Sequence, residues 1–114
     1  MEVIHGRTYL SATLRAQGRH AEARREAELA VEQLKQMGNA GVYAVATHLA
    51  LAEACFAEGD AGAGEAALRE ALQCVRDRAS DIPDPAARER FLTHVPDNAR
   101  TLALARERWG ELPG

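Results

Sequence analysis

The sequence predicts an all-α protein built from antiparallel helical hairpins, and three observations support this expectation. Hydrophobic residues make up 46% of the 114 residues but aromatic residues only 4%, so alanine and leucine supply most of the apolar surface. Glycines and prolines divide the chain into segments of helical length, and apolar residues recur every three or four positions within them. No segment shows the strict alternation that indicates a strand. We therefore expect one domain over residues 1–114, with a core of close helix contacts.

Two helices, over about residues 3–17 and 20–37, should form a first hairpin that covers about 3–37. Gly18 separates them, because glycine readily adopts the left-handed conformation that ends a helix. The second helix carries a stripe of mostly small apolar residues, which suits a close helix crossing. This stripe consists of Ala23, Ala27, Ala30, Leu34 and Met37.

The second hairpin should cover about residues 40–79, with helices over about 40–58 and 61–79. Gly59 ends the first of these helices, and Asp60 is a good N-cap for the second because its carboxylate can accept a backbone hydrogen bond. Both helices again carry apolar stripes. These are Val42, Val45, Leu49, Ala52 and Phe56 in the first helix, and Gly64, Leu68, Ala71 and Val75 in the second.

Prolines mark the boundaries of two shorter helices in the C-terminal third of the chain. Pro83 and Pro85 disfavour the helical conformation of the residues before them, but Pro85 can itself occupy the first turn of a helix. Pro96 interrupts the chain again, and the last helix should begin at Asp97 or Asn98. The apolar side chains are Ala87, Phe91, Leu92 and Val95 in the fifth helix, and Leu102, Ala105 and Trp109 in the sixth.

An internal repeat relates the two hairpins, with an offset of 41 residues from Gly18 to Gly59. When GRHAEARREAELAVEQL is laid over GDAGAGEAALREALQCV, small residues recur at the same places. This pattern resembles the tetratricopeptide repeat, and the resemblance covers about residues 4–77. The matching residues are Leu10, Ser11, Leu14, Gly18, Ala23, Ala27 and Ala30 in the first copy, and Leu51, Ala52, Cys55, Gly59, Gly64, Leu68 and Ala71 in the second.

The chain also departs from that family's pattern. Arg7 and His48 stand where the family has tryptophan, no proline closes either copy, and the spacing exceeds the usual length of about 34 residues. The resemblance implies a short solenoid of stacked hairpins, in which the first helix of each hairpin lines a concave face. A generic antiparallel helical bundle is the alternative.

The C-terminal third adds a second, narrower resemblance. Its segment Val95-Pro96-Asp97-Asn98, followed by a helix rich in leucine and alanine, is similar to the C-terminal end of large bacterial signalling proteins. In those proteins such repeats follow kinase, ATPase or transcription-regulator domains. The resemblance implies that this chain belongs to a larger regulatory protein, and that the helices over about 85–109 cap the second hairpin.

Charge and targeting signals argue against several kinds of partner. The formal net charge is -3, and arginines alternate with glutamates in runs such as RREAE, so we expect no direct binding to nucleic acid. No run of about 18 apolar residues exists, and the N-terminal MEVIHGRTYL lacks the features of a signal peptide. We expect a cytoplasmic protein that does not bind a membrane.

No arrangement of residues predicts catalysis, a cofactor or a metal site. Cys55 and Cys74 do not form a CxxC pair, so buried free thiols are expected. The segment GDAGAG lacks the Lys-Ser or Lys-Thr pair of a phosphate-binding loop. The histidines are scattered along the chain, at His5, His20, His48 and His94. Their spacing matches no metal-binding motif, and we expect a protein that is not an enzyme.

The candidate interaction site is the concave groove that the family resemblance implies. Carried over by position, its residues are Thr8, Arg15, Leu49, Glu53 and Phe56. Leu49 and Phe56 could either anchor a partner helix or peptide, or pack against the fifth helix. The lysine and asparagine pattern with which some relatives hold a C-terminal carboxylate is missing, so we do not expect an anionic peptide tail there.

Two functions agree with these expectations. The first is a non-enzymatic module for protein–protein interaction or self-association in a bacterial regulatory protein. About three stacked units usually bury both flanks of such an array, so two hairpins should leave one apolar flank exposed and form a homodimer in isolation. The alternative is a regulatory domain that senses a ligand or peptide in the groove. The expected exposed flank contains Val3, Ile4, Leu10, Leu29 and Met37.

Overall fold

The computed structural model describes residues 2–38 and 43–110, with side chains from residue 6 onward. Every regular element in these ranges is a helix, so the expected all-α class is confirmed. The elements are α1 (Glu2–Ala16), α2 (His20–Gln36), α3 (Ala44–Ala57), α4 (Ala61–Ser80), α5 (Pro85–His94) and α6 (Pro96–Trp109). None of the helices in the described part of the chain is both long and apolar enough to cross a membrane.

The helix boundaries agree with the expected ones except at two N-termini. The third helix begins at Ala44 and not near residue 40. The last helix begins at Pro96 and not at Asp97 or Asn98. Proline is accommodated there because the first residues of a helix have no intrahelical partner for their N–H groups. The helical run is interrupted here as expected, but the break is at Val95, whose backbone is extended, and Pro96 already belongs to the last helix.

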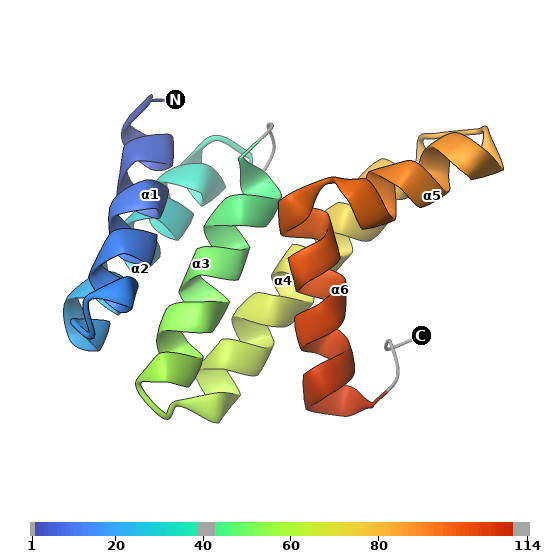
Figure 1. The fold of residues 1–114 in the computed structure, drawn as a ribbon. Coiled ribbons are helices and arrows are strands. Elements are labelled where there is room, and N and C mark those ends of the chain that lie inside the picture. The colour runs from blue at the N-terminus through green and yellow to red at the C-terminus, as the bar shows by residue number, and fades with distance from the viewer. Residues whose placement is uncertain (1, 39–42, 111–114) are drawn as a thin grey trace.

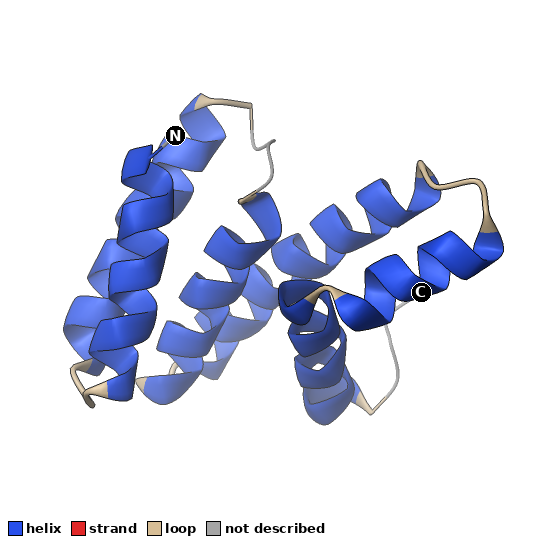
Figure 2. Ribbon diagram, turned by 45° about the horizontal axis from the view of Figure 1, so that its top comes forward, coloured by secondary structure: helices blue, strands red, loops and turns tan. Residues whose placement is uncertain are grey.

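The helices form two hairpins that lie side by side, followed by a pair of shorter helices (Figure 1). Helix α1 pairs with α2 and α3 pairs with α4, while α3 also packs on α1 and α2. Helix α6 lies against α3 and α4, and α5 extends toward one edge of the molecule beside the C-terminal part of α4. Figure 2 shows the same arrangement of the described helices from a second direction. Helix α6 thus covers the side of the second hairpin that faces away from the first.

The two hairpins turn in the same way. Gly18 and Gly59 have positive φ angles of 78° and 85°, which glycine adopts without the strain that a Cβ atom would cause. The residue after each glycine donates its backbone N–H to a carbonyl five residues back, from Arg19 to Leu14 and from Asp60 to Cys55, both at 2.9 Å. This is the hydrogen bond of a Schellman turn, and it recurs at positions 41 residues apart.

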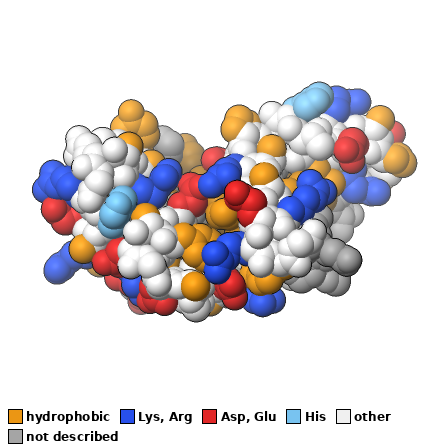
Figure 3. Space-filling view, turned by 60° about the horizontal axis from the view of Figure 1, so that its bottom comes forward, with side chains coloured by type: hydrophobic (Ala, Val, Ile, Leu, Met, Phe, Trp, Pro, Cys, Tyr) orange, Lys and Arg blue, Asp and Glu red, His pale blue; other side chains and the backbone are white. Residues whose placement is uncertain are grey.

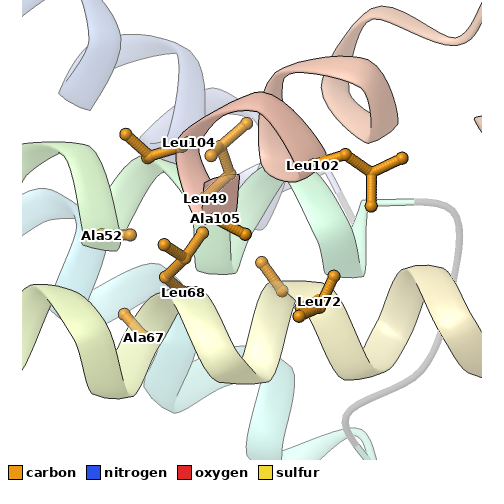
Figure 4. Close-up of a cluster of buried hydrophobic side chains, with 9 residues drawn as sticks. Leu49, Ala52, Ala67, Leu68, Leu72, Leu102, Leu104 and Ala105 are labelled. Carbon is orange, nitrogen blue, oxygen red and sulfur yellow. The ribbon is translucent and has the colours of Figure 1, made fainter. Parts of the chain in front are cut away.

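The main core lies where α3, α4 and α6 meet. Leu68 of α4 is completely buried, and Figure 4 shows it converging with Leu49 of α3 and Ala105 of α6. A smaller buried cluster joins Leu14, Ala23 and Ala54, one residue from each of the first three helices. The members of the main cluster are Leu49, Ala52, Ala67, Leu68, Ala71, Leu72, Leu102, Leu104 and Ala105.

Most residues of the expected stripes are buried, and the exceptions are the stripe of α5 and residues near the ends of other helices. The stripe residues Gly64, Leu68, Ala71 and Val75 of α4 are all buried, as predicted. Met37 is 48% exposed, so its expected place in the stripe of α2 is wrong, because α2 ends one residue before it. Val95 is 40% exposed, and no residue of α5 is fully buried. Val42 lies outside the described residues.

A short polar segment fixes α5 to α6. Asn98 is buried, and its side-chain amide donates a hydrogen bond of 3.0 Å to the carbonyl oxygen of Phe91. At the other end of α5, the carboxylate of Asp84 accepts from the backbone N–H of Ala87 and so caps the helix. Arg88 donates two hydrogen bonds to the carbonyl of Ile82. Helix α5 is therefore joined to α6 through Asn98 and to the preceding loop through Arg88, and its Leu92 side chain packs against the core.

The crossing of α3 and α4 depends on the absence of a side chain at Gly64. A Cβ atom there would lie 2.5 Å from a ring carbon of Phe56, which is closer than carbon atoms approach without overlap. The guanidinium group of Arg108 lies 4.6 Å from the centre of the same ring. The ring is thus packed between its neighbours and cannot move away freely.

We predict that Gly64→Ala lowers the free energy of unfolding by about 1 to 3 kcal/mol, as overpacking of a helix crossing does. The matched control is Gly62→Ala, because a Cβ atom at Gly62 meets nothing closer than 4.0 Å. Alanine has the higher helix propensity, so this control should be stabilised by up to about 1 kcal/mol. Urea unfolding measures the change in the free energy of unfolding for both variants. Equal effects of the two substitutions would show that the crossing does not need glycine, and Phe56→Ala should abolish the penalty.

Candidate functional site

A groove of about 360 Å³ runs between α1 and α3. Helix α1 supplies one wall, α3 supplies the floor and the other wall, and the first turn of α6 reaches its edge. The groove combines aromatic, small apolar and charged side chains. Its lining residues are Thr8, Tyr9, Ala12, Arg15, Tyr43, Ala46, Leu49, Ala50, Glu53 and Asp97.

The structure brings four of the five residues expected in the groove together, and it places the fifth elsewhere. Thr8, Arg15, Leu49 and Glu53 all line the groove, whereas Phe56 does not. Leu49 is only 4% exposed, so it belongs to the floor and does not project as an anchor.

Leu49 and Phe56 pack against α6 and not against the fifth helix, which was one of the two expectations for them. Leu49 belongs to the buried cluster that contains Leu104 and Ala105 of α6, and Phe56 packs against the same cluster. The difference arises because α5 extends to the edge of the molecule, which leaves α6 to cover α3 and α4.

Tyr9 and Asp97 line the groove although neither was expected there. Tyr9 is 72% exposed, the highest exposure among the large hydrophobic side chains of the described residues. Helical spacing could have indicated it, because Tyr9 lies three positions before Ala12 and therefore on the same face of α1. Asp97 could not be placed from the sequence, since its position depends on how α6 folds back onto α3.

Glu53 links three helices at one end of the groove. Its carboxylate pairs with Arg15 of α1 at 3.4 Å and with Arg100 of α6 at 2.7 Å. The Glu53 side chain is 15% exposed, so it is less screened by solvent than a typical surface carboxylate. On the α1 side, the hydroxyl groups of Thr8 and Thr47 lie 3.1 Å apart. The polar groups of the groove are thus already positioned by contacts within the protein.

A second candidate surface is the flank of the first hairpin that faces away from α3. Leu10 lies two residues from Thr8, or about 200° around the helix, and Thr8 contacts α3. Leu29 likewise lies two residues from Val31, on the other side of its helix, and Val31 is buried beside His48 of α3. Leu10 and Leu29 therefore lie on the outer side of the hairpin. Their exposed fractions are 43% and 41%.

The composition of this flank agrees in part with the expected one. Leu10, Leu29 and Met37 are exposed as predicted, with Met37 at 48%. The side chains of Val3 and Ile4 lie outside the described part of the structure. Leu10 and Leu29 together make up the surface that we call the outer flank, and Met37 is exposed at the C-terminal end of α2.

Arg24 fastens α2 to the turn of the second hairpin. Its guanidinium group pairs with Glu58 at 3.3 Å and with Asp60 at 3.0 Å. The hydrogen bond to Asp60 raises the pKa of Arg24 above its ordinary value. The backbone N–H of Ala63, together with Arg24, holds the pKa of Asp60 below its ordinary range. These contacts fix the relative position of the two hairpins.

The remaining titratable candidates do not assemble into a reactive site within the described residues. No group of three or more metal-ligating side chains is found among them. Cys55 is buried and Cys74 is half-buried, and both are free thiols. Burial raises the pKa of each thiol, which disfavours the reactive thiolate. On the face shown in Figure 3, acidic and basic side chains are interspersed without a continuous patch of one sign.

His48 is a buried titratable group at the interface of the two hairpins. It is 1% exposed and lines a small cavity together with Lys35 and Glu70. Burial lowers the pKa of His48, Lys35 lowers it further, and Glu70 opposes the shift. The neutral imidazole is therefore favoured in the folded protein.

Comparisons of the chain with models of known protein families, with curated proteins and with solved structures found no match. The family resemblance drawn from the sequence therefore stays a prediction.

We predict that the protein loses stability as the pH falls from about 7.5 to about 5, and that His48 causes part of the loss. The unfolded chain takes up a proton at the ordinary histidine pKa, whereas folded His48 resists protonation, so acid favours unfolding in this window. His48→Leu should flatten the pH dependence of the unfolding free energy measured in urea. The exposed His94 provides the control His94→Leu, which should keep the dependence of the original protein. If the unfolding free energy of His48→Leu kept the same pH dependence, the loss of stability in acid could not be assigned to His48.

Proposed function

We propose that this chain is a protein-interaction module of a bacterial regulatory protein, that it self-associates through its outer flank, and that it catalyses no reaction. The proposal includes a tetratricopeptide-like stacking of the two hairpins, with α5 and α6 as the terminal cap, in a cytoplasmic protein. Its partner is a second copy of the chain or another protein that presents a complementary apolar surface.

The repeated turn geometry supports the stacking part of the proposal. Gly18 and Gly59 occupy equivalent places in turns with the same hydrogen bonds. The small residues Ala23 and Gly64 occupy equivalent places in α2 and α4, and both are buried. Small residues at these places let paired helices approach closely.

The outer flank is the observation that carries the proposal. Leu10 and Leu29 expose more than two fifths of their surface on the side of the hairpin that no described helix covers. The opposite side of the array is different, because α6 already covers α3 and α4 there. Burying a large apolar side chain contributes about 1.5 to 3 kcal/mol, so covering both leucines favours association.

We predict that the protein is a dimer at high concentration and that Leu10→Glu shifts it to a monomer. The added carboxylate would have to be buried without a partner in the dimer, which is unfavourable. Light scattering behind a sizing column, over a roughly hundredfold concentration range, measures the change in molar mass.

The control for this experiment is Val95→Glu. Val95 is 40% exposed, close to the 43% of Leu10, but it lies at the junction of α5 and α6, far along the chain from the outer flank. This variant should keep the dimer. A monomer at all concentrations, or a dimer that survives Leu10→Glu, would contradict self-association through the outer flank.

The groove between α1 and α3 supports a second candidate, a regulatory domain that senses a peptide or small molecule. Tyr9 provides an exposed aromatic surface there, and Arg15 and Glu53 provide polar groups in fixed positions. The volume of about 360 Å³ lies within the range of small-molecule sites, about 300 to 1,000 Å³.

If the groove binds peptides, Ala12→Trp should abolish the enrichment of peptides from a displayed random library, because the indole would fill it. Ala12 is exposed on the groove wall, so the larger side chain should not disturb folding. Ala21→Trp, on an exposed position of α2 outside the groove, is the control and should enrich the same peptides. Equal enrichment by both variants would exclude the groove as the peptide site.

A further inference from the structure

A second cleft, of about 580 Å³, lies between the C-terminal half of α4, helix α5 and the middle of α6. It is separate from the groove between α1 and α3 and shares no lining residue with it. Its volume also falls within the range of small-molecule sites. The cleft lies where α5, which has no fully buried residue, leaves part of the surface of α4 uncovered.

The floor of the cleft is apolar. Val75 is completely buried, and Ala79 and Leu102 are 7% and 9% exposed, so these residues connect the cleft to the core. Leu92 forms part of the opposite wall on α5 and packs against the main core cluster. An apolar group that entered the cleft would therefore exchange water for contacts with side chains from three helices.

The rim of the cleft is basic. Arg76, Arg88 and Arg106 line it, and Glu89 is its one acidic lining residue among those the structure describes. Each of the three arginines lies one helical turn from a floor or wall residue of its own helix, Arg106 from Leu102, Arg88 from Leu92 and Arg76 from Ala79. The guanidinium group of Arg88 is fixed by its two hydrogen bonds to the carbonyl of Ile82.

Arg106 is the rim residue best placed to hold an anion. Its side chain is exposed, and within the described ranges no carboxylate forms an ion pair with it. The other two arginines of α6 are engaged, Arg100 with Glu53 and Arg108 with Glu65. A carboxylate could thus bind Arg106 without breaking an ion pair between described residues.

We propose that this cleft binds a small amphiphilic anion, a carboxylate joined to an apolar body. The apolar body lies against Val75, Ala79 and Leu102, and the carboxylate faces Arg106 and the neighbouring arginines. Charge complementarity selects this class of ligand, since three basic side chains and one acidic side chain surround an apolar floor. The other groove has the opposite balance, with Arg15 against Glu53 and Asp97.

The test is a titration of the isotope-labelled protein with decanoate, followed by its backbone amide NMR signals. Decyltrimethylammonium carries the same apolar chain with a positive head group and is the matched control ligand. We expect decanoate to shift the signals of residues around the cleft, such as Val75, Ala79 and Leu92. The cationic amphiphile should bind at least about tenfold more weakly, because its head group meets like charges.

Two charge-reversal variants make the test specific. Arg106→Glu should weaken decanoate binding by about tenfold or more, and Arg90→Glu, an exposed residue of α5 outside the cleft, should change it by less than about twofold. Melting temperatures confirm that both variants fold. Neither residue belongs to the outer flank, so the result of this experiment does not depend on whether the protein self-associates through that surface.

The proposal is overturned if both amphiphiles bind equally well, or if the two variants weaken decanoate binding to the same extent. It is also overturned if decanoate shifts no signal near the cleft. If Leu92→Glu lowers the molar mass in solution, a second copy of the chain covers the cleft and the small-molecule assignment is wrong. Binding to anionic lipid vesicles without binding to monomeric decanoate would likewise contradict it.

Discussion

The packing of α3 on four other helices is the interaction on which the rest of the structure depends. Helix α3 contacts α1, α2, α4 and α6, and eight of its 14 residues are buried. Those residues are small or of medium size, which lets neighbours approach on several sides at once. Gly64, which has no side chain, likewise lets α3 approach the facing surface of α4 closely. The helices that pack on α3 keep other sides that the described structure leaves open, and α3 itself stays partly exposed along the groove.

These open sides coincide with the three surfaces to which we assign functions. The outer flank is the side of α1 and α2 that faces away from α3. The groove is the concave side along α1 and α3, where Glu53 connects both helices to α6. The basic cleft lies where α5 leaves part of α4 uncovered. A chain with only 4% aromatic residues builds its core from alanine and leucine, and it places exposed side chains such as Tyr9 and Leu10 at its edges.

The local elements could be predicted from the sequence, but the arrangement of the C-terminal helices could not. The stops at Gly18 and Gly59, the Asp60 cap and the stripe of α4 all result from short-range chemistry, and the structure contains them. Thr8, Arg15 and Glu53 were expected in the groove because the family resemblance implies that the first helix of each hairpin lines a concave face, and these three residues do line the groove. The place of Phe56, the contribution of Asp97 and the basic cleft depend on how α6 folds back onto α3 and α4. No local pattern encodes that contact, since it joins residues far apart in the chain.

Amide hydrogen exchange, resolved to single residues, shows whether α3 is the central element of the fold. If it is, amides in the middle of α3 and the facing part of α4 exchange most slowly, at a rate set by global unfolding. Amides of α5, which has no fully buried residue, should exchange much faster. Protection of α5 equal to that of α3, or early exchange of α3 while α1 and α2 stay protected, would contradict the central place of α3.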